Sequence, residues 1–415
     1  MTDAALVLFD DDEALDWRPF TLTRPAGELL FGTETLRARA ERAFAMRCIG
    51  HRTAERLAGF DEHDSPAVLA SPDSIPSDRG VLFLSARAVP DPPEPPSLGD
   101  RPAAVSIDGR ACGLWLPPGT GRAPAEEFFA DPERNVPADV PVRDVPGRLL
   151  ERVWDLIAHN AERVERDIAA AAARAGDRSG APTPDSVHRL GDAPLVLGRD
   201  VEIEPGVVLD LRAGPIRLDD GVRVRAFTRL AGPSYVGPGS ALLGGPVEAV
   251  SIGPVCKVHG ELEETIILGY TNKAHTGFLG HACLGRWVNL GALTTNSDLK
   301  NNYGPVRMWT PGGTVETGLT KLGCLLGDHV KTAIGTMIAT GAVIEAGSNV
   351  FGSDPPRYLP PFSWGTADLS AAYDLDRFLE AAERVMARRD VRLTDGQREL
   401  LRRAWRHGRE SVRDR

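Results

Sequence analysis

Residues 326–349 read LGDHVK TAIGTM IATGAV IEAGSN, four successive groups of six that begin with a branched side chain. Glycine or another small residue recurs inside most of these groups. Short strands that meet at tight corners stack in this way into a three-sided parallel β-helix, in which a coil takes about 18 residues and buries one aliphatic side chain per face. The stretch therefore predicts a left-handed parallel β-helix.

The same six-residue spacing extends well beyond this stretch. It begins groups at Leu230 and Val236, and again at Phe278, Leu284 and Leu290. We expect the β-helix to occupy residues 187–352. About 20 residues, 296–315, break the register and are expected to loop outward, and such insertions often lie on a binding face.

The first 145 residues carry a different pattern. A short apolar run at 5–9 and another at 80–90 indicate buried strands. Residues 103–116 predict a hairpin with Asp-Gly at its turn, and 34–45 predict a helix. Strands that alternate with helices are typical of an α/β domain, so residues 1–145 are predicted to form one.

Two helical regions flank the repeat. The apolar spacing in 146–178 predicts one long linking helix. Residues 353–415 predict a C-terminal helical tail, in which Thr394 and Gln397 have the spacing of a capping box. We expect the helices of this C-terminal tail to cover the open end of the β-helix.

Composition restricts the class of function. The net charge is −10 and the pI is near 5.5, which gives no general attraction to nucleic acid or anionic lipid. The five cysteines are scattered and form no C-x-x-C pair, so neither disulfides nor a zinc site is indicated. The N-terminus lacks the pattern of a signal peptide, and no apolar run is long enough to cross a membrane. We expect a cytoplasmic protein.

All five lysines fall between residues 257 and 331, and every other basic side chain that is not histidine is arginine. An ammonium group is a compact point charge that loses its proton when desolvated, whereas a guanidinium group stays charged. Either this window needs ammonium chemistry, or its close-packed surface tolerates arginine poorly.

Residues 272–281, NKAHTGFLGH, combine groups suited to acyl transfer to an amine. His275 could act as the base, because imidazole titrates near neutral pH. The ammonium groups of Lys257, Lys273 and Lys300 could bind a sugar phosphate. Amide side chains for the sugar follow at Asn289 and Asn296.

These residues identify a resemblance. Lys273 and His275 precede FLG, the sequence NLGAL begins at Asn289, and an Asn-Ser-Asp motif with Lys300 follows at 296. The pattern resembles the acetyltransferase half of bacterial bifunctional N-acetylglucosamine-1-phosphate uridylyltransferase/glucosamine-1-phosphate acetyltransferases. The whole chain looks like a divergent sugar nucleotidyltransferase branch of that family.

The resemblance implies roles for individual residues. It makes His275 the catalytic base, places Lys257 and Lys273 near the sugar phosphate and Asn289 at the sugar, and puts Gly291 and Ala292 beside acetyl-CoA. It also implies a homotrimer with sites between neighbouring β-helices. Two positions depart from the family pattern, because Phe278 and Ser297 stand where the family has tyrosine. The identity of the acceptor is therefore open.

The N-terminal half departs further. The family has Gly-x-Gly-Thr-Arg-Met after its first strand, whereas this chain has FDDDEALDWRPFTLTRP. Arg18 and Arg24 could bind phosphates, and Asp10, Asp11 and Asp12 could hold Mg²⁺. Alternatively, the arginines are surface residues and the acids cap a strand end.

The sequence thus predicts an enzyme that transfers an acetyl group from acetyl-CoA to an amino-sugar phosphate, expected to be glucosamine-1-phosphate. With an active N-terminal half it would also transfer a nucleotidyl group from UTP, with Mg²⁺, and produce UDP-N-acetylglucosamine. A non-catalytic sugar-nucleotide sensor or scaffold is one alternative. A γ-type carbonic anhydrase is another, although it needs three histidines for Zn²⁺. We expect His281 to be structural, and leave His259 and His329 open.

Overall fold

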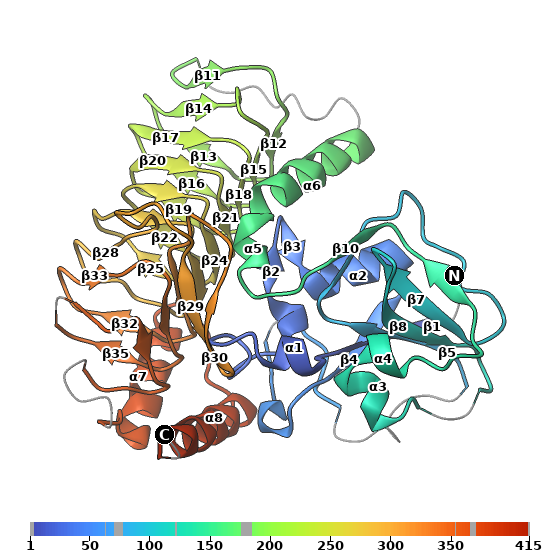
Figure 1. Ribbon diagram of the computed structural model, residues 1–415. Coiled ribbons are helices and arrows are strands. Elements are labelled where there is room, and N and C mark those ends of the chain that lie inside the picture. Colours follow the sequence, from blue (N-terminus) through green and yellow to red (C-terminus); the bar gives the residue numbers. More distant parts are fainter. Residues whose placement is uncertain are drawn as a thin grey trace. The chain divides into compact units, whose positions relative to one another are not determined.

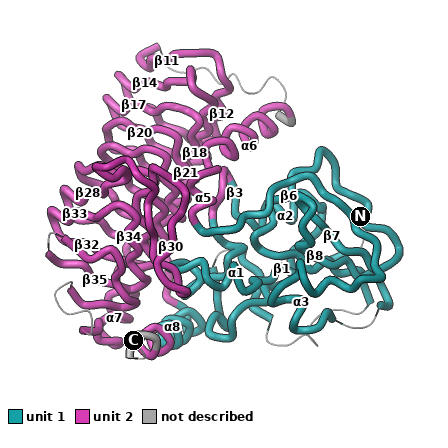
Figure 2. The backbone as a smooth tube through the Cα atoms, in the orientation of Figure 1, with its two compact units in different colours: residues 1–29, 34–153, 394–404 teal, residues 30–33, 154–393, 405–415 magenta. Residues whose placement is uncertain are grey.

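The computed structural model describes residues 4–62, 64–69, 78–120, 123–175, 185–352, 354–365 and 371–413. The chain divides into two compact units (Figure 2). Unit 1 comprises residues 1–29, 34–153 and 394–404, and unit 2 comprises 30–33, 154–393 and 405–415. Within the described ranges, no helix combines the length and apolar character that crossing a membrane requires.

Unit 1 is built on a mixed sheet. Strand β1 pairs in parallel with β4 on one side and β5 on the other, and β8 and β7 continue the sheet as an antiparallel hairpin. The strands in sheet order are β4 (Arg47–Arg52), β1 (Ala4–Phe9), β5 (Gly80–Ser85), β8 (Arg110–Leu116), β7 (Ala103–Ile107) and β9 (Val142–Asp144). The predicted α/β character is confirmed.

The hairpin between β7 and β8 turns where the sequence predicts. Asp108 and Gly109 have φ values of 54° and 73°, as a two-residue turn of this type requires. The apolar run at 80–90 forms two strands instead of one, because the chain bends at Ala86 and Arg87. The second, β6 (Ala88–Pro90), pairs with β10 (Gly147–Leu149) outside the main sheet.

Helix α2 (Leu36–Phe44) follows the predicted bounds closely. The Thr35 hydroxyl accepts a hydrogen bond from the Ala38 amide at 3.1 Å, and Ala45 ends the helix in the left-handed conformation. The other helical segments of unit 1 are short. They are α1 (Asp12–Leu15), η1 (Ala26–Glu28), η2 (Glu55–Leu57), α3 (Glu126–Ala130) and α4 (Pro132–Asn135).

The single linking helix predicted for 146–178 is wrong in its first part. The chain forms strand β10, then the short α5 (Asp155–Ala158) and only then α6 (Asn160–Ala175). Residues 176–178 lie outside the described ranges. At Gly147 an added Cβ would lie 2.4 Å from the Val89 carbonyl oxygen, so the strand depends on a close backbone approach. Pairing with β6 therefore overrides the helical spacing.

Unit 2 contains a parallel β-solenoid whose strands stack in three faces (Figure 1). The first face runs through β11 (His188–Leu190), β14 (Val208–Asp210), β17 (Thr228–Ala231), β20 (Gly245–Glu248), β23 (Leu262–Glu263) and β26 (Leu279–Gly280). The first face continues in the later coils with β28 (Thr295–Asn296) and β33 (Met337–Ile338), which pair with each other in parallel.

The second face is the longest. It runs through β12 (Leu195–Leu197), β15 (Ile216–Leu218), β18 (Ser234–Val236), β21 (Ser251–Ile252), β24 (Ile266–Gly269), β27 (Cys283–Arg286), β31 (Cys324–Leu326), β34 (Ala342–Ile344) and β36 (Tyr358–Leu359). The third face contains β13 (Glu202–Ile203), β16 (Arg223–Val224), β19 (Ala241–Leu242), β22 (Lys257–Val258), β25 (Asn272–Lys273), and later the pair β32 (Lys331–Thr332) and β35 (Asn349–Val350). The predicted parallel β-helix is confirmed.

The six-residue spacing has a simple physical basis. The branched residues Leu326, Ile338 and Ile344 that begin the groups are buried in one continuous core. At the corners after the second face the chain repeatedly adopts the left-handed conformation, with φ between 55° and 63° at Tyr270 and Trp287. Burial of the apolar side chains offsets the cost of this strained conformation.

The predicted break in the register is present, but its segment does not simply loop outward. It contains the antiparallel hairpin β29 (Arg307–Thr310) and β30 (Gly313–Glu316). Met308 is buried, and the Trp309 ring stacks on Tyr358 with centroids 3.8 Å apart. Apolar side chains thus fold this segment back onto the later coils.

The C-terminal tail forms α7 (Leu375–Ala387) and α8 (Asp395–Arg413). The capping box is confirmed, because the Thr394 hydroxyl accepts from the Gln397 amide and the Gln397 side chain accepts from the Thr394 amide, both at 3.2 Å. Phe378 of α7 packs edge-on against His329 and Phe362. This helix therefore lies against the corners of the last coils.

Candidate functional site

In unit 1, three parallel strands end at one edge of the sheet. In the sheet order β4-β1-β5, the chain passes from β1 to β4 on one side and then to β5 on the other side of β1. Ligands of open α/β sheets bind at the carboxyl ends of strands at such a switch point. The residues that follow the strands there are Asp10, Thr53 and Arg87.

Asp10, a predicted metal ligand, is buried. Its carboxylate accepts a hydrogen bond from the Ala26 amide at 3.1 Å and one from the Thr53 hydroxyl at 2.5 Å. Burial raises the pKa of Asp10 to about 6, although the hydrogen bond from Thr53 and the charge of His51 act in the opposite direction. The side chain thus ties the ends of two strands to the following loop.

Asp11 is also engaged within the protein. One carboxylate oxygen accepts from the Ala14 amide at 2.9 Å and caps helix α1, and the other accepts from the Ser85 hydroxyl at 2.7 Å. Arg87 donates to both oxygens at 2.8 and 3.0 Å. Asp12 is exposed. In this arrangement the oxygens of Asp10 and Asp11 already accept protein hydrogen bonds, and binding of Mg²⁺ by the three acids stays a prediction.

A cavity of about 300 Å³ opens beside Asp11. Carboxylates outnumber guanidinium groups in its described wall, and several are paired across it, with Arg110 2.6 Å from Glu151 and Arg152 2.8 Å from Glu13. The lining residues are Asp11, Asp12, Glu13, Arg87, Arg110, Ala130, Asp131, Pro132, Glu133, Glu151 and Arg152. An acidic wall repels a bare triphosphate, and a bound cation would reduce that repulsion.

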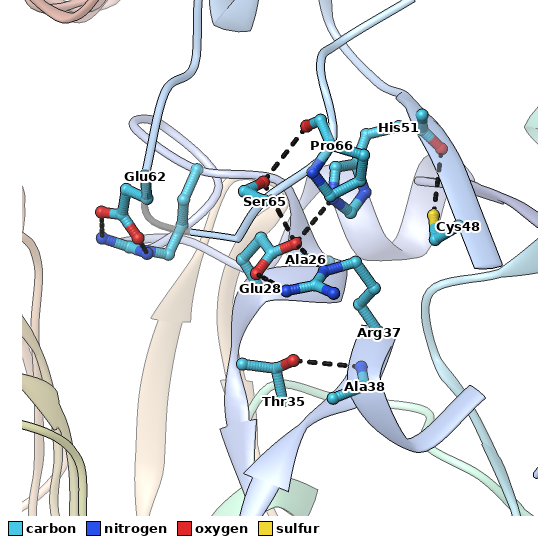
Figure 3. Close-up of polar contacts among 12 residues, drawn as sticks. Ala26, Glu28, Thr35, Arg37, Ala38, Cys48, His51, Glu62, Ser65 and Pro66 are labelled. Carbon is cyan, nitrogen blue, oxygen red and sulfur yellow. Dashed lines mark hydrogen bonds and ion pairs between the residues drawn. The ribbon is translucent and has the colours of Figure 1, made fainter. Parts of the chain in front are cut away.

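A second buried cluster in unit 1 centres on Glu28 (Figure 3). Its carboxylate lies 2.8 Å from Nε2 of His51 and 2.5 Å from Nε of Arg37, and the Ser65 hydroxyl donates to it at 3.2 Å. Burial alone would raise the pKa of Glu28, but the hydrogen bonds and charges of His51 and Arg37 outweigh it and hold that pKa at about 2. The cluster is a neutralised charge network inside the domain.

The two predicted phosphate-binding arginines do not line the cavity. Arg24 is buried and donates to both carboxylate oxygens of Glu62, each at 2.9 Å. Its guanidinium carbon also lies 5.8 Å from the centre of the Phe60 ring. Arg18 is half-buried in the preceding loop. In this structure Arg24 holds two loops together.

In unit 2, His275 is exposed at the corner between β25 and β26. Its neighbour Lys273 is buried, and the ammonium donates to the carbonyl oxygens of His259 at 2.8 Å and His275 at 2.5 Å. Burial lowers the pKa of Lys273 to about 8. Lys273 therefore fixes the His275 corner from inside, and its predicted place near the sugar phosphate stays a prediction.

Asn296 and Lys300 also have structural partners. The Asn296 amide accepts from the Gly280 amide at 2.8 Å and donates to the Gly280 carbonyl oxygen at 2.9 Å, so it joins two coils. Lys300 donates to the Pro305 carbonyl oxygen at 2.8 Å within the inserted segment. Asn296 thus ties the start of the insertion to the preceding coil, and Lys300 makes a hydrogen bond within the insertion.

Lys257 and Asn289 do lie on one face. Lys257 pairs with Asn272, Asn272 bridges to Asn289, and Asn289 bridges to Lys331, so the four side chains occupy one register of the third face. Residues in one register across neighbouring parallel strands point to the same side. We call these four residues the polar ladder. The Asn272 amide donates to the Asn289 side chain at 3.1 Å.

The polar ladder borders a cavity of about 220 Å³. The Tyr270 and Trp287 rings stack there with centroids 4.3 Å apart. Lys331 donates to the His329 carbonyl oxygen at 3.2 Å, and burial lowers its pKa to about 8. The described lining includes no acid and consists of Tyr270, Asn272, Trp287, Val288, Asn289, Lys331, Val385, Arg388 and Arg389. This wall suits an anion.

Most residues of this cavity were missed from the sequence. Lys331 belongs to the window of lysines, which was the one signal that pointed to it. Arg388 and Arg389 directly follow α7, far along the chain, and no local pattern connects them to Asn289. At the small-residue step a Cβ at Gly291 would lie 2.5 Å from the Ala333 carbonyl group, so two coils approach closely there, and the predicted place of Gly291 and Ala292 beside acetyl-CoA stays a prediction. Ala292 follows it at the same corner and is half-buried.

The remaining histidines do not converge. His259 follows β22, His281 follows β26 and His329 follows β31, so they occupy corners between different pairs of faces. Within this chain they do not form the three-histidine site of the carbonic anhydrase alternative.

Comparison with known proteins first defines the class of the N-terminal part. Residues 6–175 match the sequence profile of a family described as "Sugar nucleotidyl transferase". The match covers less than half of the chain and includes the carboxyl edge of the β1, β4 and β5 strands. Residues 6–175 are therefore similar to sugar nucleotidyl transferases.

Particular relatives are bifunctional. The chain is 29% identical over 192 residues to "Bifunctional protein GlmU" of Nitrosospira multiformis, covering 40% of this chain and 37% of that protein. It is 30% identical over 172 residues to the protein of the same name from Acaryochloris marina, covering 40% and 29%. A "Bifunctional sugar-1-phosphate nucleotidylyltransferase/acetyltransferase" of Sulfurisphaera tokodaii is 29% identical over 91 residues, covering 22% and 23%. The chain is distantly homologous to these proteins and spans well under half of their length.

Proposed function

We propose that unit 2 transfers an acetyl group from acetyl-CoA to the amino group of an amino-sugar phosphate, with glucosamine-1-phosphate as the acceptor. The observation that carries the proposal is the polar ladder beside the His275 corner. It brings Asn289 and two lysines to one face of the solenoid together with Asn272, which lies three residues along the chain from the exposed His275. The name of the Sulfurisphaera relative includes the word acetyltransferase, which supports the proposal.

The chemistry follows from these groups. The acceptor nitrogen attacks the carbonyl carbon of the thioester, and the His275 imidazole takes the proton that the nitrogen loses. The carbon–sulfur bond then breaks and CoA leaves as its thiol. Lys257, Lys331, Arg388 and Arg389 supply positive charge for the acceptor phosphate, since an ammonium or guanidinium group binds phosphate well.

We also propose that unit 1 transfers a nucleotidyl group from UTP to the acetylated sugar phosphate, which would yield UDP-N-acetylglucosamine. This step rests on the family match at 6–175 and on the cavity at the carboxyl edge of its sheet. Any Mg²⁺ that accompanies the triphosphate would meet Asp12 and Glu13 in the cavity wall. Asp10 and Asp11 would have to exchange their present partners to reach it.

A sugar-nucleotide sensor or scaffold remains a second candidate for unit 1. One specific observation favours it. Asp11 is paired with Arg87, and Arg24 is paired with Glu62, so each of these charges predicted for nucleotide binding is neutralised by a partner within the protein. We further propose a homotrimer, as the family resemblance implies, and a cytoplasmic location, where acetyl-CoA and UTP are available.

One assay separates these proposals. Purified protein is incubated with glucosamine-1-phosphate, acetyl-CoA and UTP, and free thiol and pyrophosphate are followed independently. We expect thiol release that depends on the amino sugar, and pyrophosphate release that depends on the acetylated product. Thiol without pyrophosphate would assign unit 1 to binding only, and an absence of amino-sugar-dependent thiol release would contradict acetyl transfer.

A further inference from the structure

Unit 2 contains a group of ionisable side chains away from the polar ladder. Glu263 ends strand β23, Glu264 occupies the corner after it, and His281 occupies the equivalent corner after β26. One ligand atom from each of the three lies within 4.8 Å of those of the others. His281 is buried, and the two glutamates are half-buried. The group thus combines one imidazole with two carboxylates at a partly closed site.

The orientation of His281 is fixed by a fourth residue. Its Nδ1 lies 2.8 Å from a carboxylate oxygen of Asp298. This contact makes Nδ1 the protonated nitrogen when the ring is neutral, and leaves the lone pair of Nε2 directed toward Glu264. Histidines that bind metals are usually held in this way by a carboxylate at the other nitrogen.

The separation between the facing atoms matches metal ligation better than a direct hydrogen bond. Nε2 of His281 and a carboxylate oxygen of Glu264 are 3.4 Å apart. That distance is long for a charge-assisted hydrogen bond, which is about 2.7–2.9 Å. Two ligands that each lie about 2.0–2.2 Å from a tetrahedral zinc ion are separated by roughly 3.4 Å.

The backbone holds these ligands before any ion arrives. Strands β23 and β26 pair in parallel, and the His281 amide donates to the Glu263 carbonyl oxygen at 3.0 Å. Glu264 and His281 both have positive φ, at 43° and 47°, so the same corner conformation recurs in neighbouring coils. The relative positions of the ligands therefore follow from the stacking of the solenoid.

We propose that Glu263, Glu264 and His281 bind a divalent transition-metal ion of the zinc type, with Asp298 orienting the histidine. Lys321 lies 2.9 Å from Glu263 and is nearly half exposed, so its ammonium occupies part of the cation's place and can swing into solvent. Asp298 lies near the start of the inserted segment and Lys321 lies shortly after its end, and the Leu322 amide donates to the Asp298 carbonyl oxygen at 2.8 Å and so closes the base of the insertion. The ion would fasten this segment to the coil stack.

The test uses the full chain, stripped of metal with a chelator and then dialysed. Binding of Zn²⁺ is measured by calorimetry, and Co²⁺ serves as a probe because its visible absorption reports a low-coordinate site that includes nitrogen. We expect one ion per chain. His281→Ala and Glu264→Gln should each weaken binding at least tenfold, and Asp298→Asn should weaken it by about 10- to 100-fold, as loss of an outer partner of a ligand does.

Two further variants make the test specific. Lys321→Met removes the competing ammonium and should strengthen binding, whereas a site unrelated to Glu263 would not respond. His188→Ala, at an exposed histidine on β11 of the same unit, should leave binding unchanged. Circular dichroism confirms the fold, and should His281→Ala unfold, Glu264→Gln and Asp298→Asn carry the test. Absence of stoichiometric binding, or equal binding by the folded Glu264→Gln variant, would overturn the proposal. Neither result depends on acetyl transfer.

Discussion

Buried charges in this chain are neutralised in two different ways. Glu28 is surrounded by cations, and the pKa of its carboxyl is held at about 2 despite burial. Lys273 and Lys331 instead donate to backbone carbonyl oxygens, and burial lowers the pKa of each to about 8. Stability therefore rises with pH in both cases, but the charge of Glu28 stabilises the fold, whereas the charges of Lys273 and Lys331 destabilise it.

Glu28→Gln should destabilise unit 1 at neutral pH. The folded pKa of Glu28 lies below its ordinary value of 4.5, so its contribution is fully present above pH 4.5 and is lost as pH falls toward 2. A shift of this size corresponds to roughly 3 kcal/mol at most. Hydrogen exchange of the β1 and β4 amides would measure it, with exposed Glu55→Gln as the control. A loss of protection that does not shrink between pH 4.5 and 3 would contradict the proposed network.

Lys331→Met should stabilise unit 2 at pH 7. Because the folded pKa of Lys331 is depressed to about 8, the unfolded chain binds more protons between about pH 8 and 10.5, and stability rises with pH in that window. The variant should remove part of this rise, and Lys273 accounts for the rest. Urea unfolding at several pH values tests it against Lys257→Met, an exposed lysine in the same ladder. An unchanged pH dependence would show that Lys331 is solvated.

At the scale of elements, the corners between the faces restrict which substitutions the solenoid can tolerate. The chain turns between faces with backbone groups in close contact, and a side chain at such a point must displace a neighbouring coil. Gly291 is the clearest case near the candidate site, because the atoms that an added Cβ would meet belong to the Ala333 backbone.

Gly291→Ala is expected to destabilise unit 2 by about 1–3 kcal/mol, as overpacking a well-packed site does. The matched control is Gly312→Ala in the hairpin turn, where a Cβ would meet nothing closer than 3.9 Å. Thermal unfolding of both variants makes the comparison. If the two variants unfold at the same temperature, the Gly291 corner is more open than the structure shows.

The elements that could be predicted from sequence are those with a local cause. The six-residue groups, the Asp-Gly turn and the Thr394 capping box each fix a conformation within a few residues. The helix predicted for 146–178 failed where β10 pairs with β6, a partner some 60 residues away in sequence. The hairpin at 307–316 was recognised only as a break, because its burial depends on coils that come later in the chain.

The residues of the candidate site likewise fall into those that could be predicted from the sequence and those that could not. His275, Lys257 and Asn289 were found because they lie in one sequence window. Lys273, Asn296 and Arg24 have the residue types that ligand binding needs, but the fold uses them for internal hydrogen bonds. Arg388 and Arg389, which directly follow α7, reach the cavity through tertiary packing that no sequence spacing reveals.

At the scale of the whole molecule, we propose that unit 2 transfers the acetyl group and that unit 1 transfers the nucleotidyl group. Arg24→Ala and Glu62→Gln provide a test, because both break the same contact in unit 1. Should Arg24 act by holding its loops, both variants are expected to lower pyrophosphate release similarly while thiol release stays unchanged. A loss confined to Arg24→Ala would indicate a direct phosphate contact, and equal loss of both activities in a folded variant would contradict the separation.

The most direct test of the central claim is the rate of thiol release by the His275→Ala variant with glucosamine-1-phosphate and acetyl-CoA. Loss of a positioned base costs about 10²- to 10⁴-fold in rate, so we expect a fall of that size with acetyl-CoA affinity nearly intact. His188→Ala serves as the control. A folded His275→Ala variant that keeps more than about a tenth of the wild-type rate would contradict the assignment.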